Sequence, residues 1–188
     1  MAKQKYRDPR GPHLRVYHEL MFAPAYRVLS RSAKALFFDM RAKLNGSNNG
    51  NIEATLNKLK HVGWTSGHTI ATALYELLAL GFIVRTRSGS YAIGKGQCAL
   101  YGFTDIEILE QKGKCDSAPA AFNHRAYESV GHAQQALKEG VERLRAFSKK
   151  LDEERKNLAL VKKKALCRKR TELKCENCTE RREIQCKN

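Results

Sequence analysis

The strongest pattern of apolar and polar positions lies between Thr65 and Gly81, where apolar residues recur every three or four positions. That spacing is typical of one face of an α-helix. Ser66 suits the start of this helix because its hydroxyl can accept a first-turn amide, and Gly81 suits a left-handed end. We therefore predict a helix that packs one side and exposes the other. The packed side is Ile70, Ala73, Leu74, Leu77 and Leu78, and the exposed side is His68, Thr72, Tyr75, Glu76 and Ala79.

Two further helical patterns precede this one. Residues 33–44 form an amphipathic stretch that Ser30 or Ser32 can cap, with Leu36, Phe37, Met40 and Leu44 as its apolar stripe and Lys34, Arg41 and Lys43 exposed. A second helix is predicted from about residue 54 to residue 62. Its inward positions are Ile52, Leu56, Leu59 and Val62, and its outward cations are Lys58 and Lys60. Gly63 and Trp64 then open a turn before the helix described above.

A β-hairpin is predicted after Gly81. Residues 82–86 and 98–103 are apolar and β-branched or alternating, which favours two strands. The tip between them, residues 87–96, carries glycines, Tyr91 and the cations Arg87 and Lys95. Glycine lets a backbone approach a phosphate closely, so we interpret the hairpin as a wing; an ordinary flexible loop is the alternative. The order helix, turn, helix, wing is that of a winged DNA-binding domain.

The predicted fold class is mostly α with a small β-hairpin wing, an α+β arrangement with a long C-terminal helix and a basic, cysteine-containing tail. We divide the chain into a flexible basic arm (1–14), a winged helix-turn-helix domain (15–103), a linker (104–123), a charged helix (124–166) and a disordered basic tail (167–188). A chain of 188 residues with 42% hydrophobic residues suffices for one modest core.

Charge is concentrated at the two ends of the chain. The formal net charge is +16; residues 1–44 hold ten Lys and Arg against three acidic residues, and residues 141–188 hold sixteen against eight. A polyanionic partner is the natural inference, with double-stranded DNA ahead of RNA because of the predicted helix order. Solubility alone is the alternative explanation of this charge.

The C-terminal helix contains four leucines at seven-residue intervals, Leu137, Leu144, Leu151 and Leu158. This seam predicts a homodimer through a coiled coil, although the positions four residues after each leucine are mostly polar; a solvated charged helix is the alternative. In the tail, Cys167 and Cys186 flank the Cys-x2-Cys pair of Cys175 and Cys178, and these four cysteines could hold zinc. Their spacing is unusual, so the prediction is reduced cysteines, no metal and no cofactor.

Enzyme activity is not predicted. The six histidines form no i, i+4 metal pair, and no nucleophile and base set is recognisable. No run approaches 18 apolar residues, and the N-terminus leads into charged residues, so we expect a soluble cytoplasmic protein.

Three motifs carry a resemblance. Tyr26 to Ala33 reads Tyr-Arg-x-Leu-Ser-x-x-Ala, Asn45 to Gly50 reads Asn-Gly-x-Asn-Asn-Gly, and Leu77 to Ile83 joins a helix end to a strand. With these motifs, residues 20–103 resemble the winged helix-turn-helix proteins of bacterial phages, plasmids and integrative elements. The resemblance implies DNA binding, as a transcriptional regulator or a replication-associated protein of the element, and no catalytic residues.

The predicted function is sequence- or shape-selective binding of double-stranded DNA as a transcriptional regulator of a mobile element. The alternatives are a replication-initiation accessory protein and a protein-interaction module without a specific DNA site. The helix between Thr65 and Gly81 corresponds to the recognition helix of a winged domain. It carries threonine, histidine and Glu76 at positions where Arg or Lys is common, so strong guanine recognition is not expected. The predicted DNA-binding residues are His68, Thr69, Thr72, Tyr75, Glu76, Lys58, Lys60, Arg41, Lys43, Arg85, Arg87 and Lys95.

Overall fold

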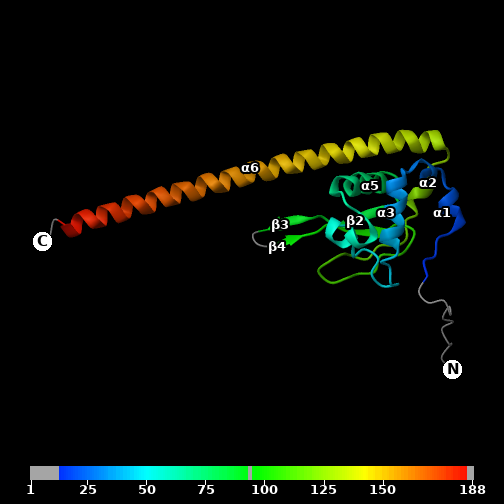
Figure 1. Ribbon diagram of the computed structural model, residues 1–188, viewed down its shortest axis with the longest axis horizontal. Coiled ribbons are helices and arrows are strands. Elements are labelled where there is room, and N and C mark those ends of the chain that lie inside the picture. Colours follow the sequence, from blue (N-terminus) through cyan, green and yellow to red (C-terminus); the bar gives the residue numbers. More distant parts are fainter. Residues whose placement is uncertain (1–12, 93–94, 186–188) are drawn as a thin grey trace, which may run out of the picture. The chain divides into compact units, whose positions relative to one another are not determined.

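The computed structural model describes residues 13–92 and 95–185, and the side chains of residues 90–95, 155 and 162–185 are not part of that description. The chain forms two compact units, Met1–Leu144 and Arg145–Asn188. The fold is a mostly helical α+β arrangement with a small three-stranded antiparallel sheet and a long C-terminal helix (Figure 1).

The first unit begins with three helices, α1 (His18–Phe22), α2 (Pro24–Val28) and α3 (Arg31–Arg41). A short strand β1 (Ile52–Glu53) leads to helix α4 (Leu56–Leu59), which continues as the 3-10 turn η1 (Lys60–Val62). Helix α5 (Gly67–Ala79) follows. The Ser30 hydroxyl accepts the amide of Ala33, so Ser30, of the two predicted serines, caps α3.

The strands after α5 are β2 (Ile83–Arg87), β3 (Ser90–Ala92), β4 (Lys95–Gln97) and β5 (Leu100–Phe103). The three-stranded sheet has the order β1-β5-β2, and β3 pairs with β4 as a separate two-stranded hairpin. Ile83 pairs with Phe103 and Ile52 with Tyr101. The register shifts between Arg85 and Arg87, an irregularity of the kind that bends a strand pair. The predicted hairpin is therefore present, divided into two parts.

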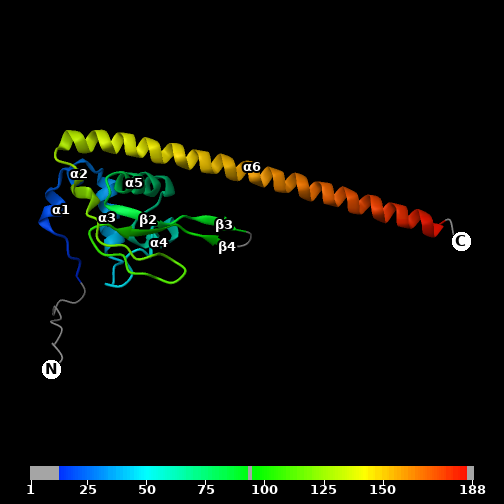
Figure 2. The same ribbon diagram turned by 180° about the vertical axis from the view of Figure 1, so that it is seen from behind.

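The core lies between α3, α5 and one face of the sheet, which Figure 2 shows from behind. Phe37 of α3 is at its centre, edge-on to Phe82 at 5.9 Å and to Phe103 at 5.3 Å between ring centroids. Edge-to-face contact at this distance is a favourable arrangement of aromatic rings. Ile70, Ala73, Leu74 and Leu77 of α5 are buried in the same cluster, as their helical spacing predicts. Leu78 is only partly buried against it.

The segment 104–123, predicted as a linker, is instead an ordered part of the first unit. Isolated bridges join Ile108 to Ala118 and Gln111 to Cys115. Gly50 has φ +94°, and a Cβ there would lie 2.7 Å from Ile108 Cγ2 and 2.9 Å from Cys115 Sγ. The loop therefore closes tightly over Gly50, and only glycine fits at this position.

Buried Asn49 explains how the loop is held. Its side-chain amide donates to the carbonyl oxygens of Phe103, Ile106 and Glu107 at 3.0, 2.9 and 3.1 Å, and its oxygen accepts the Phe103 amide at 2.7 Å. One side chain thus satisfies backbone groups on both sides of the end of β5. In the sequence, Asn49 is marked only as a member of the motif from Asn45 to Gly50.

Two boundaries differ from the prediction. The second helix is shorter than residues 54–62, and Val62, predicted inward, is exposed. After the loop of residues 104–122, a 3-10 turn η2 (Asn123–Ala126) precedes helix α6 (Val130–Gln185). Helix α6 continues past residue 166, so its backbone is helical through most of the segment predicted as a disordered tail.

Candidate nucleic-acid interface

The exposed side of α5 is the centre of the predicted interface. Ser66 caps the helix by accepting the amide of Thr69 at 3.3 Å. His68 is exposed, and Thr69, Thr72 and Tyr75 are half-buried. Because the residues 68, 72, 75 and 79 follow a four-three-four spacing, they form one stripe opposite the buried face.

The C-terminal end of that stripe is covered by the protein itself. Tyr127 donates its hydroxyl to the carbonyl oxygen of Ala79 at 3.2 Å. A Cβ at Gly140 of α6 would lie 2.7 Å from the Ala79 Cβ, so the two helices approach closely there. Figure 1 shows the first turns of α6 beside α5. Among the described residues, this cover lies at the C-terminal turn of α5, whereas His68 in its first turn is exposed.

Three of the predicted phosphate-binding cations are exposed. Lys58 lies on α4, Lys60 on η1 and Arg85 on β2. His61, beside Lys60, is exposed as well and was not predicted as a site residue. Lys95 begins β4, and its side chain lies outside the described part of the structure.

Arg41 is not a surface cation, so the prediction that its side chain is exposed was wrong. Its side chain is 5% exposed and forms an ion pair with Asp105, which is 8% exposed, at 2.7 Å between Nη1 and Oδ1. The guanidinium lies 5.0 Å from the ring centroid of Phe103 and 5.7 Å from that of Phe37. A guanidinium can stack on aromatic rings in this way while a carboxylate neutralises it.

Lys43 and Arg87 are also engaged within the fold. Lys43 donates to the carbonyl oxygen of Glu53 at 3.0 Å, and burial lowers the pKa of its ammonium group, an effect that the nearby carboxylates of Glu53 and Asp39 oppose. Arg87 donates to the carbonyl oxygen of Cys98 at 3.2 Å. Both side chains are half-buried, so neither is a freely presented phosphate contact.

Glu76 contacts another helix of the protein. Its Oε2 accepts the backbone amide of Ser30 at 2.8 Å, at the N-terminus of α3. A carboxylate at a helix N-terminus is stabilised by the helix dipole. Glu76 thus joins α5 to α3, and a base contact would compete with this bond.

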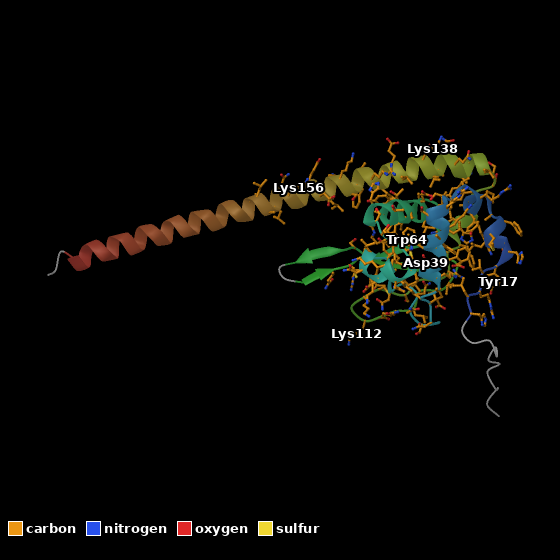
Figure 3. All side chains as sticks on the ribbon, in the orientation of Figure 1. Tyr17, Asp39, Trp64, Lys112, Lys138 and Lys156 are labelled. Atoms are coloured by element: carbon orange, nitrogen blue, oxygen red, sulfur yellow. The ribbon has the colours of Figure 1, made fainter. Side chains whose placement is uncertain are left out.

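Trp64 is a positioning residue that the sequence analysis places only in the turn. Its indole Nε1 donates to Oδ2 of Asp39 on α3 at 2.7 Å, and Figure 3 shows the two side chains together. Gly63, one residue earlier, has φ +95°. These two residues set the direction in which the chain enters α5. The sequence signal for this positioning role was an isolated tryptophan next to a glycine in a predicted turn.

His124 is a second polar residue that the sequence analysis missed. It is 2% exposed, stacks on Phe82 at 5.3 Å between ring centroids, and its Nδ1 has no hydrogen-bond partner among the described residues. Burial lowers the pKa of the imidazole; Asp105 and Glu19 oppose that shift, and Arg125 and Arg41 add to it. No sequence pattern marks this histidine as internal.

Among the described residues, no group of three metal-ligating side chains is found. Cys167, Cys175 and Cys178 lie in α6 with undescribed side chains, and Cys186 lies outside the described residues. The zinc site considered for these cysteines therefore lies outside the described side chains.

Comparisons with protein-family models, curated proteins and solved structures find no match to this chain. None of the described helices has the length and apolar character needed to cross a membrane. What the interface binds must therefore follow from its own residues.

Proposed function

We propose that residues 15–103 form a winged helix-turn-helix domain that binds double-stranded DNA, as a transcriptional regulator of a mobile element. The observation that carries this proposal is the succession α3, β1, α4, α5, β2 and β5, with the β3–β4 hairpin projecting between the last two strands. In winged domains, the helix after the turn enters the major groove and the hairpin approaches the backbone. Helix α5 and the β3–β4 hairpin correspond to these two parts.

The N-terminal half of α5 supplies the proposed base contacts. His68 can donate to an acceptor edge, and the methyl groups of Thr69 and Thr72 can contact thymine. Tyr75 is the last residue of the stripe before the end that α6 covers. Because α5 contains no Lys or Arg, base recognition is expected to be weak and DNA shape to contribute.

Lys58, Lys60 and Arg85 supply the proposed phosphate contacts, since they are the exposed members of the predicted cation set whose side chains are described. Each cation that neutralises a phosphate releases counterions, so each contributes a slope of about −0.9 to the dependence of log K on log salt. Three contacts would give a slope of about −2.7 in addition to that of the basic ends.

The test is a salt titration of duplex DNA binding by the full chain and by two triple variants. Lys58→Ala/Lys60→Ala/Arg85→Ala should weaken binding about tenfold or more and make the slope shallower by about 2 to 3. The matched control, Lys112→Ala/Lys114→Ala/Arg125→Ala, removes the same charge from exposed positions elsewhere in the first unit. Equal loss in both variants would mean that the chain is a general polyanion binder. Thermal unfolding of both variants controls for misfolding.

A protein-interaction module is the second candidate. The engagement of Glu76 with Ser30, and the cover that Tyr127 and Gly140 provide over Ala79, reduce the surface of α5 that DNA could reach. This alternative predicts little DNA affinity and association that salt hardly changes. Between a regulator and a replication accessory protein, mapping the bound fragments decides: promoters support the first and an origin the second.

A further inference from the structure

The second unit presents an apolar seam along α6. Phe147, Leu151, Leu158 and Val161 follow four-seven-three spacing, which places them on one side of a helix. Phe147, Leu158 and Val161 are 55%, 56% and 63% exposed, and Leu151 is half-buried. Within the described residues of this unit nothing covers the seam, and solvent-exposed aliphatic rows of this kind mark interaction sites.

The seam differs from the set of four leucines in the predicted homodimer. Leu137 packs against the core of the first unit, and Leu144 lines a crevice with Leu78 and Ala79. Both leucines already contact their own domain. The positions three residues after Leu144, Leu151 and Leu158 are Phe147, Glu154 and Val161, two apolar residues and one acidic residue. This alternation of three and four residues is the a/d pattern of a coiled coil.

The positions that flank the seam indicate what kind of helix fits it. In a two-stranded coil the residues beside the a and d positions face those of the partner. In the sequence these positions are Ser148, Lys150, Arg155, Asn157, Lys162 and Lys164, with no acidic residue. The side chains of Arg155, Lys162 and Lys164 lie outside the described part of the structure. Asp152 and Glu153 fall on the opposite side of the helix. In a pair of identical helices, parallel or antiparallel, cations would face cations, which is unfavourable.

We propose that residues 147–161 dock an acidic amphipathic helix of another protein, with its apolar seam on Phe147, Leu151, Leu158 and Val161. Glutamates beside the partner's seam would face the cationic flanks. Glu154 lies inside the seam, and a single polar residue at such a position fixes register. The Glu154 carboxylate therefore favours a partner helix that carries a lysine or arginine at the facing position. The proposal concerns the second unit alone and does not depend on DNA binding by the first.

The experiment uses the full chain and three synthetic peptides of about 28 residues, because shorter isolated helices are marginally stable. The first peptide has leucine at a and d, glutamate at e and g, and one lysine placed to face Glu154. The second has the same composition with the seam scrambled, and the third has lysine at e and g. By fluorescence anisotropy, the first should bind about tenfold or more tightly than either of the others.

A pair of leucine substitutions separates the seam from the rest of the helix. Leu158→Asn should weaken binding of the first peptide about tenfold, the loss expected on removing one buried leucine contact. Leu160→Asn is the matched control, because Leu160 is 54% exposed and lies on the opposite side of α6. Both variants should bind duplex DNA as the parent chain does.

Three outcomes would overturn the proposal. Equal binding of the scrambled acidic peptide would mean that charge alone is recognised. Binding that Leu158→Asn and Leu160→Asn change equally would exclude the seam. Sedimentation equilibrium that shows a dimer, broken by Leu158→Asn and retained by Leu160→Asn, would identify the occupant as a second copy of this chain. A defect of the Lys58, Lys60 and Arg85 variant in DNA binding would bear only on the function of the first unit.

Discussion

Eight of the predicted DNA-binding residues divide into two groups that the sequence does not distinguish. Arg41, Lys43, Glu76 and Arg87 are bonded to other parts of the fold, whereas Lys58, Lys60, His68 and Arg85 are exposed. Both groups contain cations from the predicted helices and hairpin. The difference is whether another segment of the fold both bonds the side chain and covers it from solvent, and that depends on tertiary packing.

Arg41 is the extreme member of the bonded group. Its stem follows Phe37 along one side of α3, and its partner Asp105 is 64 residues away in the sequence. Long charged side chains can bury their stems beside apolar residues, so an amphipathic pattern assigns such a residue to the surface. The structure places it in the interior because the loop after β5 brings a carboxylate to it.

The largest predicted effect is on stability and comes from Arg41→Met. Removing one member of a buried ion pair leaves the other charge uncompensated, so the free energy of unfolding should fall by about 3 to 5 kcal/mol. Urea unfolding of the purified chain measures this loss.

The double variant Arg41→Met/Asp105→Leu is the control, because it removes both charges. It should recover most of the loss, since apolar residues can replace a buried pair at little cost. A single variant that loses less than about 1 kcal/mol would mean that water reaches the pair.

A smaller effect is expected for Glu76→Ala. The variant removes a charge-assisted hydrogen bond to the Ser30 amide and a favourable charge at the N-terminus of α3, which should cost about 1 to 2 kcal/mol. Glu110→Ala, at an exposed position, is the control and should change stability by less than about 0.5 kcal/mol. If Glu76→Ala leaves stability unchanged and alters DNA affinity instead, Glu76 belongs with the exposed group.

The smallest effect at neutral pH is expected for His124, a buried residue that no sequence pattern identified. Its pKa is lowered in the folded state, so the unfolded state binds the proton more strongly and stability should fall as the pH drops below about 6.5. His124→Phe should reduce that fall while changing stability little at about pH 7.5. Urea unfolding at several pH values measures it. His132→Phe, at an exposed position, should leave the pH dependence as it is.

Local patterns predicted the elements of the first unit well. Ser30 and Ser66 cap α3 and α5 as expected, the apolar positions of both helices are mostly buried, and the strands of the hairpin lie within the predicted ranges to one or two residues. Caps and periodicity depend on residues within a few positions of each other, so they can be recognised in one sequence. Whether the arrangement binds DNA stays a prediction.

The sequence by itself determined where helices and strands form, because capping and side-chain periodicity act over one or two turns. Only the tertiary structure decided which polar residues are internal. Asn49 holds the loop after β5, Arg41 meets Asp105, and Tyr127 and Gly140 cover Ala79. Each of these contacts joins segments that are 48 or more residues apart, and their polar groups are satisfied only when the chain has folded. The four leucines of α6 are an example: they recur at the same seven-residue interval, but Leu137 and Leu144 lie against the first unit and Leu158 is exposed.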